Sequence, residues 1–78
     1  MKHINKLFQE SITMSGVVKS HGKPSAEGDY PTTILIEDGE HEGKYITPWL
    51  PTRYPRESTV QVDIINPDSE YPQIIVNQ

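Results

Sequence analysis

The sequence predicts an all-β fold (minor α) in which five short antiparallel strands close into a small barrel, with a short helix at the N-terminus. Two observations predict this class. Several segments alternate apolar and polar residues with period 2 and are rich in β-branched side chains, as half-buried strands are. Most of these segments are separated by short turns that contain glycine or proline. Closure of such strands into a barrel would remove exposed sheet edges.

The N-terminal residues 3–10 carry one amphipathic helical stripe. Ile4, Leu7 and Phe8 recur at the spacing i, i+3, i+4. So short a segment cannot hold a helix in isolation, so it is expected to dock or fray. The chain is therefore expected to be one domain, with a short helix or arm at 1–10 and a barrel formed by 11–78.

Residues 11–19 are the first predicted strand, because every second residue from Ile12 to Val18 lies on one side of an alternating pattern. Gly16 within this strand predicts a bulge or a sharp bend, which small barrels need at their corners. Residues 20–31 are predicted to be a loop, because they contain two glycines, two prolines and no apolar period.

Residues 32–37 and 44–50 are predicted to pair as a hairpin across a glycine-containing turn at 38–43. Pro48 has no N–H to donate to a ladder, so the second of these strands is expected to lie at an edge or to break there. Strand alternation divides its side chains between two faces. One face carries Tyr45, Thr47 and Trp49, and the other carries Ile46, Pro48 and Leu50.

The last third of the chain contains two more predicted strands. Residues 51–57 are expected to be an extended connector, because a residue that precedes proline disfavours helix. Residues 58–65 show the most regular alternation in the chain and are predicted to be a strand. A turn at 66–72 leads to the last predicted strand at 73–78.

The order of these parts resembles the oligonucleotide-binding fold (OB-fold), including its cold-shock-type members, over residues 11–78. The resemblance rests on SGVVKS as a glycine-bent first strand, a long loop, the hairpin TTILIEDGEHEGKYITPWL and the later strand STVQVDII. SH3-like barrels have a similar outline. The resemblance implies a ligand surface on the second and third strands, flanked by the loops at 20–31 and 66–72.

Two departures limit what this resemblance implies. OB-folds usually place a helix between the third and fourth strands, where this chain has the short proline-rich segment 51–57. The cold-shock group carries closely spaced aromatic residues on its second and third strands, but this chain has no aromatic residue between positions 31 and 44. The nucleic-acid-binding residues of the family therefore do not transfer as a set.

Length, charge and cysteine content exclude several function classes. The chain has 78 residues of which 33% are hydrophobic, so its core is small and self-association or a partner would help its stability. The absence of cysteine excludes disulfides and thiol catalysis. No apolar run of ~18 residues and no signal-peptide stretch occur, so a cytoplasmic location is expected. A net charge of −4 excludes a uniformly basic nucleic-acid binder, and the acids are too dispersed in sequence for a dense acidic DNA mimic.

The segment 44–56, KYITPWLPTRYPR, gathers three cations and three aromatic residues without a single acid. Arg53 and Tyr54 lie between prolines of the connector and are expected to be exposed. Trp49 leaves two interpretations open, because the only tryptophan of so small a protein is either a core residue or a binding platform. The candidate binding residues are Lys44, Tyr45, Trp49, Arg53, Tyr54 and Arg56.

We expect a non-catalytic binding module that contacts a protein partner through this segment, since exposed Trp, Tyr and Arg are enriched at interface hot spots. A homo-oligomer is an open possibility. The alternative is single-stranded DNA or RNA, with bases stacked on the aromatic rings and phosphates paired with Lys and Arg. The negative charge of the rest of the chain favours the protein partner. Proteins of this size and composition are typical of accessory or inhibitory proteins of bacteria or phages.

The sequence predicts no metal, no cofactor and no enzymatic activity. The segment EDGEHE at 37–42 holds four carboxylates and His41, but it lacks the ligand order of a calcium loop and is predicted to be a solvated turn. His3, His21 and His41 show no metal-ligand spacing. No glycine-rich phosphate loop occurs.

Overall fold

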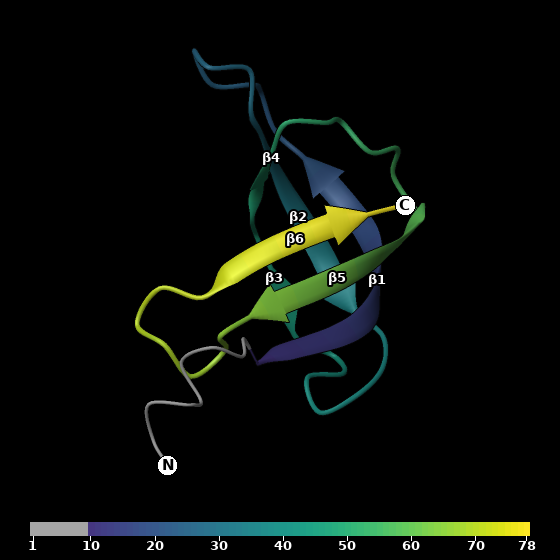
Figure 1. Ribbon diagram of the computed structural model, residues 1–78. Helices are drawn as coiled ribbons and strands as arrows, with labels where there is room; N and C mark the ends of the chain where they lie inside the picture. The colour runs from purple at the N-terminus through teal and green to yellow at the C-terminus, as the bar shows by residue number, and fades with distance from the viewer. Residues whose placement is uncertain (1–9) are drawn as a thin grey trace.

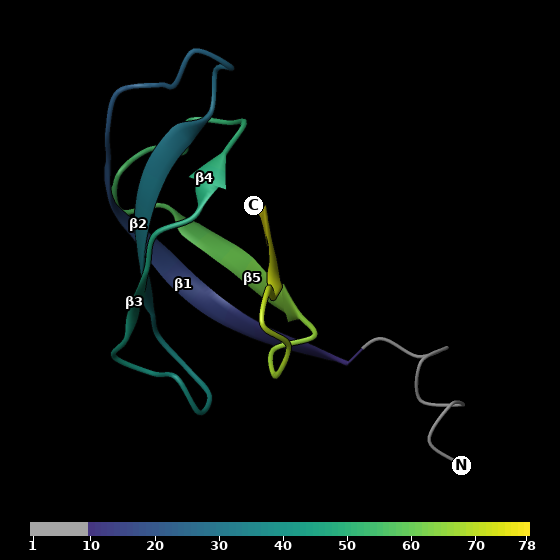
Figure 2. The same ribbon diagram turned by 90° about the vertical axis from the view of Figure 1, so that its left-hand side faces the viewer.

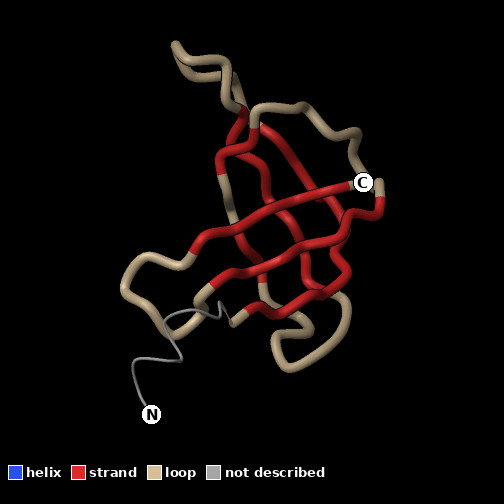
Figure 3. The backbone as a smooth tube through the Cα atoms, viewed as in Figure 1, coloured by secondary structure: helices blue, strands red, loops and turns tan. Residues whose placement is uncertain are grey.

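The computed structural model describes residues 10–78, which form one antiparallel sheet (Figure 1). The predicted helix at 1–10 lies outside the described residues except for Glu10. Over the described part, the chain consists of strands and loops (Figure 3), and no helix is long and apolar enough to cross a membrane. The strands are β1 (Ser11–His21), β2 (Tyr30–Ile36), β3 (Tyr45–Ile46), β4 (Trp49–Leu50), β5 (Thr59–Ile65) and β6 (Gln73–Asn77).

The predicted strands and the predicted hairpin are confirmed, but the third predicted strand is divided in two. β3 and β4 both pair with β2, and the break between them falls at Thr47 and Pro48. Pro48 cannot donate to the ladder, yet its carbonyl accepts a hydrogen bond from the backbone N–H of Thr32 at 3.0 Å. Proline therefore interrupts this edge of the sheet without detaching it.

The expected closed barrel is wrong, because the sheet remains open. Its strand order is β3-β2-β1-β5-β6, so the β3/β4 edge and the β6 edge do not pair with each other. The sheet instead bends strongly, and β5 and β6 lie across from β2 with an open side between the two edges (Figure 2). At one of these edges, the break at Thr47 and Pro48 leaves only the two-residue strands β3 and β4.

The core lies inside this bend and is built from the inward side of the strand alternation. β1 and β2 contribute alternate residues that pair across the sheet, such as Val18 and Ile34, both fully buried. The half-buried residues Ile12, Ile46, Ile64, Ile74, Val76 and Tyr54 pack around this centre. The buried apolar residues are Met14, Val18, Ile34, Ile36, Leu50, Val60 and Val62.

Gly16 is needed for close packing, and the bulge predicted at this residue lies elsewhere. A Cβ atom at Gly16 would lie 2.5 Å from Cγ2 of Ile34. Gly16 itself pairs regularly with Ile36 on one side and Val60 on the other. The register between β1 and β2 shifts between Val18 and Ser20, nearer the end of the strand.

The turn that joins β2 to β3 is tied back to β1 by Asp38. The backbone N–H of Ser15 donates a 2.8 Å hydrogen bond to the Asp38 carboxylate, and the N–H of Glu37 donates to the Ser15 carbonyl at 2.9 Å. Gly39 and Gly43 adopt positive φ angles of 77° and 87°, which glycine tolerates without strain. Asp38, Gly39 and Gly43 therefore stabilise the turn itself.

Asp38→Ala is expected to lower the free energy of unfolding by about 1 kcal/mol, because it leaves the Ser15 N–H without its carboxylate acceptor. Urea denaturation at neutral pH measures this change. Glu40→Ala in the same turn is the control, since Glu40 is exposed and surface substitutions of this kind usually change stability by less than ~0.5 kcal/mol. Equal effects of the two substitutions would contradict the assigned role of Asp38.

Candidate functional site

The six candidate residues of the segment 44–56 are contiguous in sequence, but the structure distributes them over separate places. Tyr45 and Trp49 lie on the outer face of the edge strands, and Tyr54 turns toward the core. Lys44 lies at one end of the sheet, and Arg53 and Arg56 lie in the connector at the other end. The edge strand between these ends is about 20 Å long at ~3.3 Å per residue, so one small ligand cannot contact all six side chains.

Two large aromatic side chains are exposed on the edge of the sheet. Trp49 is 59% exposed and Tyr45 is 62% exposed, so the interpretation of Trp49 as a core residue is wrong. Strand parity explains this outcome, because Ile46 and Leu50 have the inward positions of the same segment. The two aromatic residues are four positions apart on the same face, about 13 Å along the strand direction.

Apolar residues of β1 and β2 extend this surface across the sheet. Leu35 of β2 pairs with Tyr45 on one side and with Val17 of β1 on the other, and Pro31 pairs with Trp49. Residues directly opposite each other share one face of the sheet. We refer to Val17, Pro31, Leu35, Tyr45 and Trp49 as the aromatic face.

Sequence reasoning found only the aromatic members of this face. Val17, Pro31 and Leu35 are each half-buried, and they alternate with fully inward residues of β1 and β2. The alternation that identifies the strands places Val17 and Leu35 on the outward side. The sequence signal for this part of the aromatic face was therefore the presence of apolar residues at outward positions of two neighbouring strands.

Tyr54 is a structural residue, and the expectation that it is exposed is wrong. Its ring is half-buried and packs against the core, and its hydroxyl donates a long hydrogen bond of 3.3 Å to the carbonyl oxygen of Val76 in β6. The connector at 51–58 thus places one side chain across the open side of the sheet, where no strand pairing closes it. Tyr54 is therefore removed from the candidate binding residues.

Arg53 and Arg56 line a shallow hollow together with a residue that sequence reasoning did not include. The hollow has a volume of about 390 Å³ and is lined by Arg53, Arg56, Pro55 and His21, the last residue of β1. Both arginines are exposed, and the ion pair found among residues 10–78 joins Lys19 to Glu57 at 3.1 Å, without either arginine. Their guanidinium groups are thus available to an external anion.

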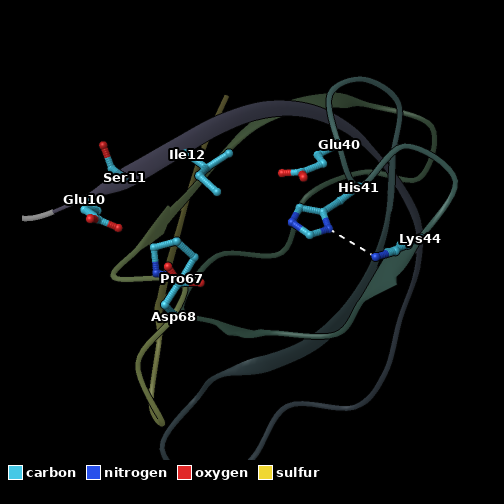
Figure 4. A pocket seen from close by; sticks show the side chains of 8 residues that line it. All are labelled: Glu10, Ser11, Ile12, Glu40, His41, Lys44, Pro67 and Asp68. Atoms are coloured by element: carbon cyan, nitrogen blue, oxygen red, sulfur yellow. Dashed lines mark hydrogen bonds between the residues drawn. The ribbon is translucent and has the colours of Figure 1, made fainter.

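Lys44 belongs to a different hollow at the opposite end of the sheet (Figure 4). Its ammonium nitrogen lies 3.3 Å from Nδ1 of His41, and both side chains face Glu10, Ile12 and Asp68 across the opening. The hollow has a volume of about 720 Å³ and is lined mainly by polar and charged side chains. Lys44 therefore contributes its charge to an acidic neighbourhood and not to the arginines.

The antiparallel topology sorts charge between the two ends of the sheet. The acidic end comprises the start of β1 and the two turns at 37–43 and 66–72, which lie together in the lower part of Figure 1. With the flanking residues Glu10 and Lys44 included, the described residues of this end have one cation, Lys44, against seven carboxylates, for a formal charge of −6. The opposite, connector end comprises 19–29 and 51–58, with four cations and three acids. The acids that are dispersed in sequence are thus gathered in space.

Neither end forms a metal site among residues 10–78, where no group of three or more His, Asp and Glu side chains is arranged to hold an ion. No protein-family model, curated protein or solved structure matches this chain.

Proposed function

We propose that the chain is a non-catalytic binding module whose aromatic face docks on a protein partner. The observation that carries this proposal is the exposure of Trp49 and Tyr45 beside apolar residues of β1 and β2. Exposed aromatic residues that adjoin other apolar surface are typical of interface hot spots. The face lies on a regular sheet, so its geometry is fixed before binding and little conformational entropy is lost.

Charge favours a protein over a nucleic acid as the partner of this face. Lys44 is next to Tyr45 in sequence, but its ammonium group lies beside His41 in the hollow at the acidic end. The acidic turn at 37–43 directly precedes the start of β3, so a phosphate backbone that follows the face would approach a formal charge of −6. An apolar or basic protein surface meets no such repulsion.

Binding of single-stranded nucleic acid is the second candidate, and one observation favours it. The exposed aromatic residues lie on the outer surface of β3 and β4, which together correspond to the predicted third strand, and the OB-fold resemblance implies a ligand surface on the second and third strands. Base stacking on an aromatic ring contributes ~1–3 kcal/mol per base. Trp49 fluorescence that changes on addition of an oligonucleotide, and recovers steeply with added salt, would support this candidate.

Trp49→Ala is expected to weaken the complex with the partner at least about 30-fold, because a central hot-spot residue contributes ~2 kcal/mol or more. Cross-linking at Tyr45 first recovers the partner. Isothermal titration calorimetry then measures the affinity of this partner for each variant. Tyr71→Ala is the matched control, since Tyr71 is 84% exposed and lies in the turn at 66–72, away from the aromatic face. Light scattering on the free protein shows whether a second copy of the chain is the partner.

If Trp49→Ala and Tyr71→Ala bind the partner equally well, the aromatic face is not the interface. Both substitutions remove an exposed aromatic side chain, so a difference in binding cannot come from a general loss of hydrophobic surface. Circular dichroism of the two variants should match that of the wild type, because both side chains lie outside the core.

A further inference from the structure

The hollow lined by His21, Arg53, Pro55 and Arg56 has a fixed position at the connector end of the sheet. The connector 51–58 passes over the end of β1, as Figure 1 shows. Two backbone hydrogen bonds hold it there: Glu57 donates to the Val18 carbonyl at 2.7 Å, and Val18 donates to the Ser58 carbonyl at 3.0 Å. These bonds bring the arginines of the connector next to the imidazole at the end of β1.

The conformation of the arginine-bearing backbone is also constrained locally. The hydroxyl of Ser58 donates to the carbonyl of Pro55 at 2.6 Å, and the N–H of Ser58 donates to the same oxygen at 3.2 Å. Glu57 completes this turn at a positive φ of 64°. Between Arg53 and Arg56 in the chain, the half-buried Tyr54 anchors the connector to β6. The two guanidinium groups therefore project from a backbone that is held at Tyr54 and in the turn at 55–58.

Arginine side chains without an acidic partner, next to an imidazole, form a site for an oxyanion. A guanidinium group donates two parallel hydrogen bonds to a carboxylate or phosphate, and such charge-assisted bonds are about twice as strong as neutral ones. A protonated imidazole adds a donor. Lys19, the lysine of β1, already pairs with Glu57 at 3.1 Å, so it is not counted among the donors of the site.

We propose that this hollow binds a single oxyanion group, a carboxylate or a phosphate ester, carried by the protein partner. The inference rests on the proposed function, because it assigns a second contact to the same partner, at the end of the sheet beyond Trp49. A run of phosphates is disfavoured, since the same end of the sheet also carries the acids Glu27, Asp29 and Glu57. The site therefore favours one localised anion over a polyanion.

The test uses three five-residue peptides with acetylated N-termini and amidated C-termini that differ only at the centre, which is glutamate, phosphoserine or glutamine, together with inorganic phosphate. Binding is followed by NMR from the ring signals of His21 and the Nε signals of Arg53 and Arg56. We expect saturable shifts with the two charged peptides and none with the glutamine peptide. The stronger of the charged peptides identifies the group as carboxylate or phosphate.

Arg53→Gln combined with Arg56→Gln is expected to weaken this binding at least tenfold, because it removes both guanidinium groups that donate charge-assisted hydrogen bonds to the anion. Both side chains are exposed, so the variant should fold. Lys23→Gln is the matched control, since it removes one exposed cation from the loop at the same end and should change binding less than about twofold. An equal loss in both variants would overturn the inference in favour of general charge attraction.

Two further outcomes would also overturn it: no saturable shift at His21 with any charged probe, or an oligo-dT affinity that rises steadily with length, as expected for a polyanion track. A different measurement tests the proposed function, which is contradicted if Trp49→Ala leaves the affinity for the partner unchanged. In that Trp49→Ala variant, the small charged peptides should still bind the hollow with wild-type affinity. The two failures are therefore distinguishable.

Discussion

Gly16→Ala is expected to lower the free energy of unfolding by about 1–3 kcal/mol, the usual cost of inserting a methyl group into a packed core. The added Cβ would lie 2.5 Å from Cγ2 of Ile34 and 3.2 Å from the carbonyl oxygen of Leu35. Neither neighbour yields easily, because Ile34 is fully buried and the oxygen belongs to the backbone of β2. A domain of this size has a total stability of about 4–12 kcal/mol, so Gly16→Val, which adds two more methyl groups, should leave part of the protein unfolded at 25 °C.

A double-mutant cycle with Ile34→Ala separates this contact from the general effect of replacing glycine in a strand. Truncation of Ile34 removes Cγ2, so the methyl group of Gly16→Ala then occupies vacated space and should cost little in that background. Urea denaturation measures all four proteins, with trimethylamine N-oxide added equally to each if the double variant is partly unfolded. Strict additivity of the two substitutions would show that the contact with Ile34 does not determine the cost.

Strand positions in this chain are predictable from sequence because each strand follows a simple parity rule. The alternation through Val60, Val62 and Ile64 identified β5, and the same rule placed Ile46 and Leu50 on one face of their segment, which the structure shows to be the core. That assignment also decides the orientation of Trp49, which shares parity with Tyr45 and so faces outward. Composition alone left open whether Trp49 is a core or a surface residue, whereas parity within a correctly placed strand gives the orientation of its side chain.

Closure of the barrel and the role of Tyr54 depend on tertiary structure that no local pattern encodes. Pro48 was correctly predicted to interrupt its strand. Whether the β3/β4 edge meets β6 depends instead on how far the whole sheet bends, and in this structure an open side remains between them. The connector crosses that side, and Tyr54 is the residue that reaches β6. Neighbouring prolines suggested exposure, but the path of the connector over the core decides the burial of Tyr54.

The candidate site was predicted in part, because sequence neighbours on an extended chain separate quickly in space. Lys44 and Arg53 are close in sequence, yet they lie at opposite ends of the sheet. Conversely, His21 is far from Arg56 in sequence and lines the same hollow. The antiparallel strand order explains both results, since it brings alternate connections to the same end of the sheet and thereby also collects the acids of two separate turns.

Tyr54→Ala is expected to lower the free energy of unfolding by about 2–4 kcal/mol, somewhat less than the ~3–5 kcal/mol for a fully buried aromatic residue, because the ring is half-buried. Tyr54→Phe keeps the ring and removes the hydroxyl that donates to Val76, so it should cost only about 0.5–1 kcal/mol. Because the ring spans the open side of the sheet, hydrogen exchange should accelerate in β6 of the alanine variant more than in β2.

Tyr71→Ala is the control for these measurements, because Tyr71 is 84% exposed and should change stability by less than ~0.5 kcal/mol. Urea denaturation of the three variants gives the stabilities, and native-state hydrogen exchange gives the local effect on β6. If Tyr54 were a surface anchor for a partner, Tyr54→Ala would match Tyr71→Ala in stability and would weaken partner binding instead. That result would return Tyr54 to the binding surface and would leave the open side of the sheet without a side chain that bridges it.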